Sequence, residues 1–296
     1  MRSVTVYLAI VFLGGALLAP WLYEAAQQLA AAFPLADSLA RYPFPRYVNR
    51  SFLIIAVLGL WPFLRANQLW SVRSLGLQPS RIAWRELGKG LLVGFASLAV
   101  VAVFALVVGP ADLDLRRGMA GLARRIGRAA ASASAVGVLE EIVFRAALFG
   151  ALRKRFTWQF ALALSSLIYA AVHFLQRATP SDSIGWDSGF AVLGQMLAGF
   201  RHAGEIFPAL LSLMVAGAIL GLSYQRSGRL YMAIGIHVGW IFWLQTNAAV
   251  TTRPTDSATW FWGTEKLIDG WFAFLILLGL GLAGRLWMPA TSERQG

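Results

Sequence analysis

Two adjacent carboxylates stand inside an apolar stretch of the chain, in the segment 140–145 (EEIVFR). On a helix, Glu141 and Arg145 are four residues apart, so their side chains share one face and are expected to pair. Glu140 then points about 100° away from this pair, without an intrahelical cation of its own. A carboxylate in this position can take a proton from a water and return it. We therefore predict Glu140 as a general base that Glu141 and Arg145 support, with a purely structural ion pair as the alternative.

Two histidines stand in other apolar stretches. His173 follows the apolar run 165–172, and His237 lies within the run 232–243. With Glu140, they could bind a metal ion such as Zn²⁺ through two imidazoles and one carboxylate, leaving a position for water. Alternatively, the imidazoles orient a water and stabilise an oxyanion without a metal. The third histidine, His202, lies in a polar stretch and is predicted to be a loop residue.

Several other chemistries lack the residues that they need. The chain has no cysteine, which excludes disulfides, thiolate metal sites and a cysteine nucleophile. It contains neither a His-Glu-x-x-His motif nor a Gly-x-Ser-x-Gly motif. No aspartate falls in the interior of an apolar run, which argues against an aspartyl mechanism.

The elements that must position these residues are apolar helices. Of the 296 residues, 58% are hydrophobic and 14% are charged, whereas a soluble domain carries about 25% charged residues. A membrane span needs about 20 mostly apolar residues. The sequence therefore predicts an all-α, polytopic membrane bundle of about eight transmembrane helices, near 4–23, 49–66, 88–110, 129–152, 157–175, 206–225, 230–249 and 268–288.

The organisation predicted from this pattern is a single integral membrane domain, 1–296, with the chemistry in a core at about 88–249. The first run lacks a convincing cleavage site, so we interpret it as a retained span rather than a signal peptide. The net charge is +12, but the arginines flank apolar runs, where they would contact lipid headgroups rather than nucleic acid. The basic segment 112–128 is expected to be either a helix in the headgroup layer or a solvated loop.

Three motifs in this order resemble the CPBP family, the CAAX-protease and bacteriocin-processing group of intramembrane endopeptidases. They are the Glu-Glu-x-x-x-Arg motif at 140–145, His173 within 169–174 and His237 within 235–240. The resemblance covers residues 140–241. It implies that Glu140 activates a water with the help of His173 and His237, and it leaves open whether a metal takes part.

One position departs from the family pattern. Many members carry asparagine four residues after the last histidine, where it helps to form the oxyanion site, and this chain has Ile241 there. Gln245 is eight residues beyond His237, more than two helical turns away. Another donor, such as Tyr169 or a backbone amide, must replace the asparagine, or activity is weakened or lost.

The function predicted from these observations is intramembrane endopeptidase activity on a membrane-anchored, lipidated or membrane-inserted protein or peptide. The predicted location is a bacterial inner membrane, where a prenylated substrate is not expected. Two alternatives remain. One is a proton-coupled transporter or relay that titrates Glu140, His173 and His237, although no internal repeat supports it. The other is an inactive relative that acts as a membrane scaffold or immunity protein, which Ile241 favours.

Overall fold

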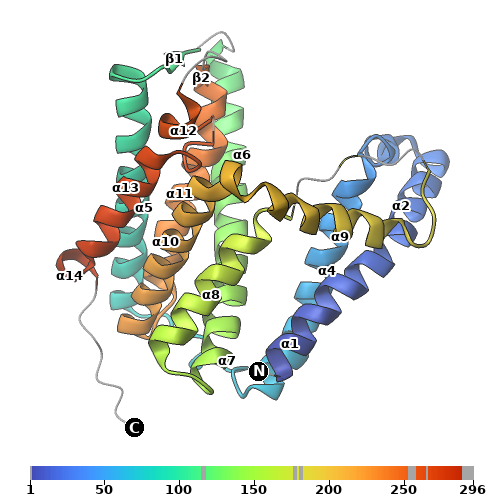
Figure 1. The fold of residues 1–296 in the computed structure, drawn as a ribbon, viewed down its shortest axis with the longest axis horizontal. Helices are drawn as coiled ribbons and strands as arrows, with labels where there is room; N and C mark the ends of the chain where they lie inside the picture. Colours follow the sequence, from blue (N-terminus) through green and yellow to red (C-terminus); the bar gives the residue numbers. More distant parts are fainter. Residues whose placement is uncertain are drawn as a thin grey trace. The chain divides into compact units, whose positions relative to one another are not determined.

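The computed structural model describes residues 2–114, 118–175, 179, 183–252, 258–264 and 266–288. Among these residues the fold is almost entirely helical, as the composition predicted (Figure 1). The chain divides into two compact units, Met1–Trp70 with Ala171–Gly204, and Ser71–Ala170 with Glu205–Gly296. The single domain predicted from the sequence stays a prediction.

The first unit is built on two long helices. A continuous helix comprises α1 (Arg2–Ala9), the π-helical η1 (Ile10–Gly14) and α2 (Gly15–Ala32). The short η2 (Pro34–Ala36) and α3 (Asp37–Ala40) lead to α4 (Phe44–Ala66), which packs against α1 and α2. Later in the chain, α9 (Ser188–Ala198) packs on α2 and is followed by η4 (Gly199–His202). The backbone of His202 thus ends a 3₁₀ turn rather than lying in an irregular loop.

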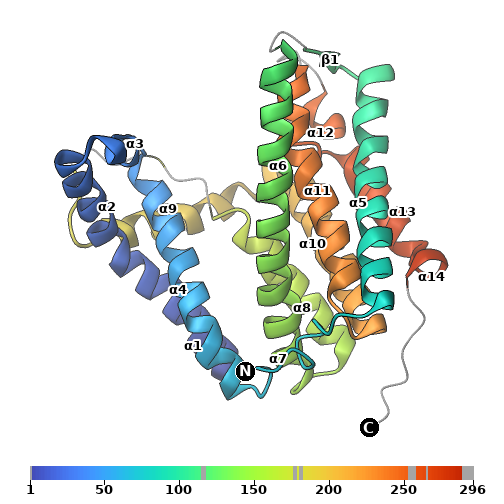
Figure 2. The ribbon, with the colours of Figure 1, turned by 180° about the vertical axis from the view of Figure 1, so that it is seen from behind.

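The second unit places long helices side by side (Figure 2). They are α5 (Arg81–Val107), α6 (Gly118–Glu141), α10 (Ala203–Ser227) and α11 (Tyr231–Val250). The π-helical η3 (Ile142–Phe149) and α7 (Gly150–Arg153) continue α6, and α8 (Trp158–Val172) follows. Two-residue strands β1 (Asp112–Leu113) and β2 (Thr251–Thr252) pair antiparallel. The remaining helices are α12 (Thr259–Trp262), α13 (Trp271–Leu282) and α14 (Gly284–Trp287).

Glycines on both helices bring α5 and α11 into close contact. A Cβ atom on Gly94 would lie 2.2 Å from the carbonyl oxygen of Ile236, and one on Gly239 would lie 2.6 Å from the amide nitrogen of Phe95. Gly90 and Gly235 repeat this arrangement one turn earlier on their helices. Small residues four apart allow helix backbones to approach closely in lipid, where van der Waals packing drives association. These glycines therefore fix the position of α11, the helix that carries His237.

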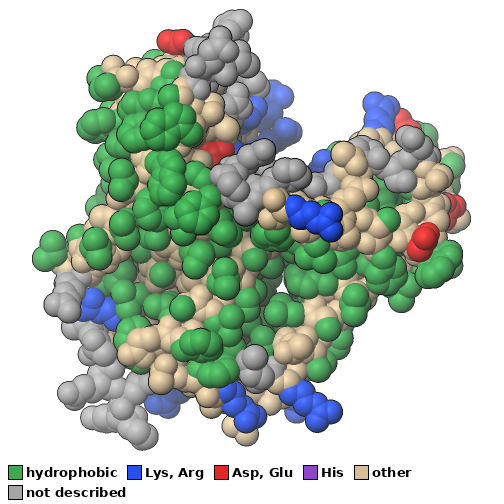
Figure 3. Space-filling model, in the orientation of Figure 1, with side chains coloured by type: hydrophobic (Ala, Val, Ile, Leu, Met, Phe, Trp, Pro, Cys, Tyr) green, Lys and Arg blue, Asp and Glu red, His purple; other side chains and the backbone are tan. Residues whose placement is uncertain are grey.

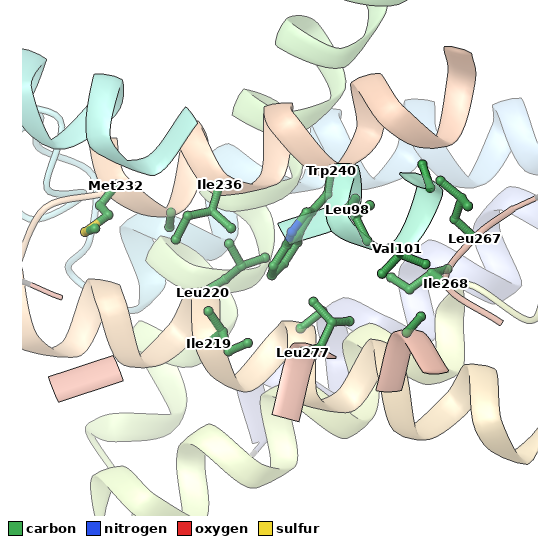
Figure 4. Packing of buried hydrophobic residues seen from close by; sticks show 14 of the residues in the cluster. Leu98, Val101, Ile219, Leu220, Met232, Ile236, Trp240, Leu267, Ile268 and Leu277 are labelled. Carbon is green, nitrogen blue, oxygen red and sulfur yellow. The ribbon is translucent and has the colours of Figure 1, made fainter. Parts of the chain in front are cut away.

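The core of the second unit lies between α5, α10, α11 and α13 (Figure 4). Trp240 of α11 packs there among Leu98 of α5, Leu220 of α10 and Leu277 of α13. Its indole N–H donates to Ser97 Oγ at 2.9 Å, so the polar atom of the buried ring is satisfied. One face of α11 packs into this core. α11 also packs against α6.

The helices are long and apolar enough to cross a membrane. Four continuous helical stretches meet this criterion among the described residues, at Arg2–Ala32, Phe44–Ala66, Arg81–Val107 and Ile206–Ser227, and shorter apolar helices occur at Trp158–Val172 and Trp271–Leu282. Apolar side chains cover much of the face shown in Figure 3. The chain is thus a helical integral membrane protein, and each of the eight predicted segments overlaps one or more helices, whereas the number of eight spans stays a prediction.

The basic segment 112–128 differs from the expected loop. Residues 112–113 form the strand β1, and α6 starts at Gly118 and runs without a break to Glu141. Arg124, Arg125 and Arg128 therefore lie on the first turns of a core helix, whereas Arg116 and Arg117 fall outside the described residues. Residues 118–128 are thus helical rather than a loop, and they continue into the apolar part of the same helix, while their position in the headgroup layer stays a prediction.

Candidate active site

The carboxylates lie where α6 changes its helical form. Glu140 and Glu141 are the last two residues of α6, and the π-helical η3 that follows carries Arg145. Glu141 keeps right-handed helical angles, φ −66° and ψ −36°, so the helix continues through this point. A π-helical turn is rare and is frequent at functional sites, because it changes the direction of side chains along an otherwise regular helix.

Glu141 is the centre of a buried charged cluster. Arg145 Nη1 lies 3.1 Å from Glu141 Oε1, which confirms the predicted i,i+4 pair. The same oxygen lies 2.8 Å from Nδ1 of His237 on α11. The side chains of Glu141 and Arg145 are 0% and 3% exposed. A carboxylate so completely removed from water needs charged and hydrogen-bonding partners, and it has one on its own helix and one on α11.

The second nitrogen of His237 turns toward Glu140. His237 Nε2 lies 3.6 Å from Glu140 Oε2 and 3.2 Å from the hydroxyl oxygen of Tyr169 on α8. The Tyr169 ring also lies under the Arg145 guanidinium, whose central carbon is 4.3 Å from the ring centroid. The Glu140 side chain is 26% exposed, unlike that of Glu141. The arrangement thus joins one fully buried carboxylate, one imidazole and one accessible carboxylate.

Close contact between α6 and α11 makes this arrangement achievable. A Cβ atom on Gly137 would lie 2.9 Å from Val238 Cγ2 and 3.4 Å from the Val238 amide nitrogen, so a side chain at position 137 would force the Val238 side chain to shift. Gly137 precedes Glu141 by one helical turn, and Val238 follows His237 directly. The absence of a side chain at position 137 thus accompanies the close packing of α6 on α11 beside the contact between Glu141 and His237.

The structure brings together four of the five predicted site residues. Glu140, Glu141, Arg145 and His237 meet within the second unit. His173 follows the last residue of α8 and lies in a turn of the first unit, so its convergence with Glu140 and His237 stays a prediction. Ile241, one helical turn beyond His237, is buried and offers no hydrogen-bond donor.

Two atoms of this cluster could serve as metal ligands. Glu140 Oε2 and His237 Nε2 approach each other, and the Nδ1 side of His237 is held by a carboxylate, as is common for metal-bound histidines. Within the described residues, no three His, Cys, Asp or Glu side chains are grouped as metal ligands are. The two-histidine zinc site therefore stays a prediction that depends on His173.

Two contacts of His237 did not follow from the sequence. Helical spacing assigned Glu141 to Arg145 alone, but Glu141 also holds His237 from another helix. Tyr169 was a candidate donor only in place of an asparagine, whereas its hydroxyl contacts His237 directly. A tyrosine inside an apolar helix usually has a hydrogen-bond partner, and this was the available signal.

These features define a helical membrane protein with a carboxylate–imidazole cluster on the interior faces of its helices. Residues 123–243, which contain the whole cluster, match the family model described as "Type II CAAX prenyl endopeptidase Rce1-like". This match confirms the CAAX-protease resemblance over that segment and supports, at the family level, an intramembrane endopeptidase. Comparisons with the curated proteins and with the solved structures gave no match.

Proposed function

We propose that this protein hydrolyses a peptide bond in a membrane-associated protein or peptide, with Glu140 as the residue that activates the water. His237 and His173 assist in this proposal, and Glu141 and Arg145 orient His237. The observation that carries it is the way His237 is held. Its Nδ1 faces the buried Glu141 at 2.8 Å, while its Nε2 faces the accessible Glu140 at 3.6 Å.

The contact with Glu141 determines what His237 can do. An ionised carboxylate only accepts hydrogen bonds, so Nδ1 carries the proton that it donates to Glu141. In the neutral imidazole, Nε2 is then an acceptor that faces Glu140. A water that replaces the Tyr169 hydroxyl as the donor to Nε2 would give its other hydrogen to Glu140, which positions the water oxygen for attack and frees the tyrosine O–H.

The reaction then needs one proton to be moved twice. Glu140 takes a proton from the water while the water oxygen bonds to the peptide carbonyl carbon. The hydroxyl of Tyr169 is the nearest described side-chain donor to His237 Nε2, and it can donate to the developing oxyanion in place of the missing asparagine. Glu140 returns the proton to the leaving amine as the carbon–nitrogen bond breaks.

The substrate class follows from where these groups lie. The catalytic carboxylates are on helices of a membrane bundle, so the scissile bond must belong to a membrane-anchored, lipidated or membrane-inserted chain. We place the protein in a bacterial inner membrane, where peptide and lipid would be its partners. The family description names a prenyl endopeptidase, and a lipidated peptide is accordingly one class of substrate to test.

The direct test uses the full chain reconstituted in lipid with a library of membrane-anchored peptides. Cleavage is compared for the wild type, Glu140→Gln, His237→Ala and His173→Ala, with Glu24→Gln as a control at an exposed carboxylate. We expect Glu140→Gln and His237→Ala to abolish cleavage and the control to retain it. Full cleavage by Glu140→Gln would overturn the proposed base.

Two further measurements, chelator treatment and proton uptake, distinguish the metal-dependent, proton-relay and inactive alternatives. Cleavage that a chelator abolishes and zinc restores would assign a metal to Glu140, His237 and His173, whereas unaffected cleavage supports the glutamate type. If vesicles containing the wild-type protein take up protons but no peptide is cleaved, the result would favour the proton-coupled transporter or relay. A wild type without either activity would favour the inactive relative to which the buried Ile241 points.

A further inference from the structure

A polar pocket lies on the same two helices as the active site but closer to the start of α6. It has a volume of about 460 Å³ and is lined by Arg125, Arg128, Ala129, Ser132, Leu244 and Gln245. Gln245 Nε2 donates to Ser132 Oγ at 3.2 Å, which joins α6 to α11 within this open pocket. Its two arginines distinguish it from a nearby groove along α5, α6 and α11, whose lining is mostly apolar and has no charged side chain.

Within the described part of the chain, the positive charge of the pocket has no acidic partner. No carboxylate among the described residues forms an ion pair with Arg125 or Arg128. The two arginines are three residues apart, so both guanidinium groups can reach one ligand. Ser132 Oγ accepts from Gln245, which leaves the serine O–H free to donate. The pocket therefore offers several donors and two positive charges to an anion.

The depth of the pocket in the membrane follows from the length of its helix. Arg128 and Arg153 stand on one continuous helix, with only Glu140, Glu141 and Arg145 charged between them. At 1.5 Å per residue, they are separated by about 37 Å along the helix. The hydrocarbon core of a bilayer is about 30 Å thick. Arg128 therefore lies at the level of the lipid headgroups on one side of the membrane, while Glu140 lies near the middle of the span.

We propose that this pocket binds the phosphate of an anionic phospholipid. The guanidinium groups of Arg125 and Arg128 match phosphate oxygens, and basic pockets between membrane helices suit anionic headgroups. Leu244 and Ala129 give the same pocket an apolar wall against which the upper part of an acyl chain can lie. The site is separate from the cluster of Glu140 and His237, and the proposal does not depend on peptidase activity.

The test is lipid binding to the purified full chain in mixed micelles, measured by native mass spectrometry. Phosphatidylglycerol is titrated against phosphatidylcholine for the wild type and for the double variant Arg125→Gln/Arg128→Gln. Arg124→Gln is the matched control, since Arg124 lies on the same turn and does not line the pocket. Each cation near an anionic surface contributes about 1 kcal/mol, so we expect the double variant to bind phosphatidylglycerol about thirtyfold more weakly. The control should change by less than about threefold.

Three outcomes would overturn the proposal. They are equal binding of phosphatidylcholine, an equal loss in Arg124→Gln, and unchanged affinity in the double variant with an unchanged unfolding temperature. Competition experiments with soluble anions identify which anion the pocket binds. Inorganic phosphate or an acidic peptide that displaces phosphatidylglycerol at the same concentration as added lipid would reassign the pocket to that ligand. Failure of peptide cleavage in the separate assay would leave this result unaffected.

Discussion

Two carboxylate–cation clusters hold the second unit together, and only one of them has a surplus charge. At one end of the bundle, Arg229 donates through Nε to Glu86 Oε2 at 2.9 Å and through Nη2 to Oε1, which ties α5 to the turn between α10 and α11. The hydrogen bonds that Arg229 donates to Glu86 raise the pKa of the guanidinium above its usual value. The pair is complete, because one acid meets one base in a bidentate contact.

The cluster around Glu141 is built differently. Glu141 contacts both Arg145 and His237 through one oxygen, and a second acid, Glu140, stands next to it with a 26% exposed side chain. A buried charge is retained at a cost, so an acid beyond the one that Arg145 needs indicates a use other than stability. The matched pair of Glu86 and Arg229 ties helices together. The cluster around Glu141 has an additional acid and an imidazole, and these groups can move protons.

The largest effect is expected at Glu140. Glu140→Gln keeps the size and the hydrogen-bonding shape of the side chain but cannot take a proton from water. We expect a loss of about 10³-fold in kcat with little change in the unfolding temperature, because general base catalysis contributes roughly 10²–10⁴-fold. Peptide cleavage and thermal unfolding of the same preparation measure both. A variant that lost stability and kept activity would reverse the roles of the two clusters.

Glu141→Ala should affect stability and activity together. It leaves the buried Arg145 without its carboxylate and releases Nδ1 of His237. Removing one partner of a buried pair costs about 3–5 kcal/mol. Denaturant unfolding in micelles measures this loss. A destabilisation below about 1 kcal/mol, the value typical of exposed pairs, would contradict the interpretation of Glu141 as the central buried charge.

Tyr169→Phe should act on the reaction alone. It removes the hydroxyl 3.2 Å from His237 Nε2 and keeps the ring that packs on Arg145. If the hydroxyl donates to the oxyanion, kcat should fall by about 10²-fold, as for the removal of one oxyanion donor. KM and the unfolding temperature should stay near those of the wild type. A change in KM alone would assign Tyr169 to substrate binding instead.

Gly94→Ala tests the packing that positions His237. The added Cβ would stand 2.2 Å from the carbonyl oxygen of Ile236, so α5 and α11 must separate, at about 1–3 kcal/mol. Gly88→Ala on the same helix is the matched control, because nothing lies within 4 Å of its Cβ position. Unfolding measurements on both variants decide the point. Equal effects at the two positions would show that the close approach is unimportant.

The smallest effect is expected at the complete pair. Arg229→Gln removes the charge opposite the buried Glu86 but keeps a side-chain donor, and the Arg229 side chain is 31% exposed, so we expect a loss of about 1 kcal/mol in stability. Activity for each folded molecule should be unchanged. Cleavage assays normalised to the folded fraction test this outcome. A loss of activity comparable to that of Glu140→Gln would show that both clusters belong to one functional network.

The sequence alone determined the helices, the membrane environment and most of the candidate residues. Apolar runs of span length predict helices directly, because an unsatisfied backbone group is costly in lipid. The spacing of Glu141 and Arg145 likewise predicted their ion pair, since residues four apart on a helix are neighbours. The continuous α6 was less predictable, because the polar residues 118–128 do not show whether a helix ends at the membrane surface.

What only the tertiary structure decided is the contact of His237 with Glu141 on one side and with Glu140 and Tyr169 on the other. These residues come from three helices, and their separation along the sequence, up to 97 positions between Glu140 and His237, carries no information on depth or rotation. Close glycine packing sets both quantities, by bringing α11 against α5 and α6. Local spacing therefore fixes pairs within one helix, whereas the cluster exists only because backbones of different helices approach within the reach of a side chain.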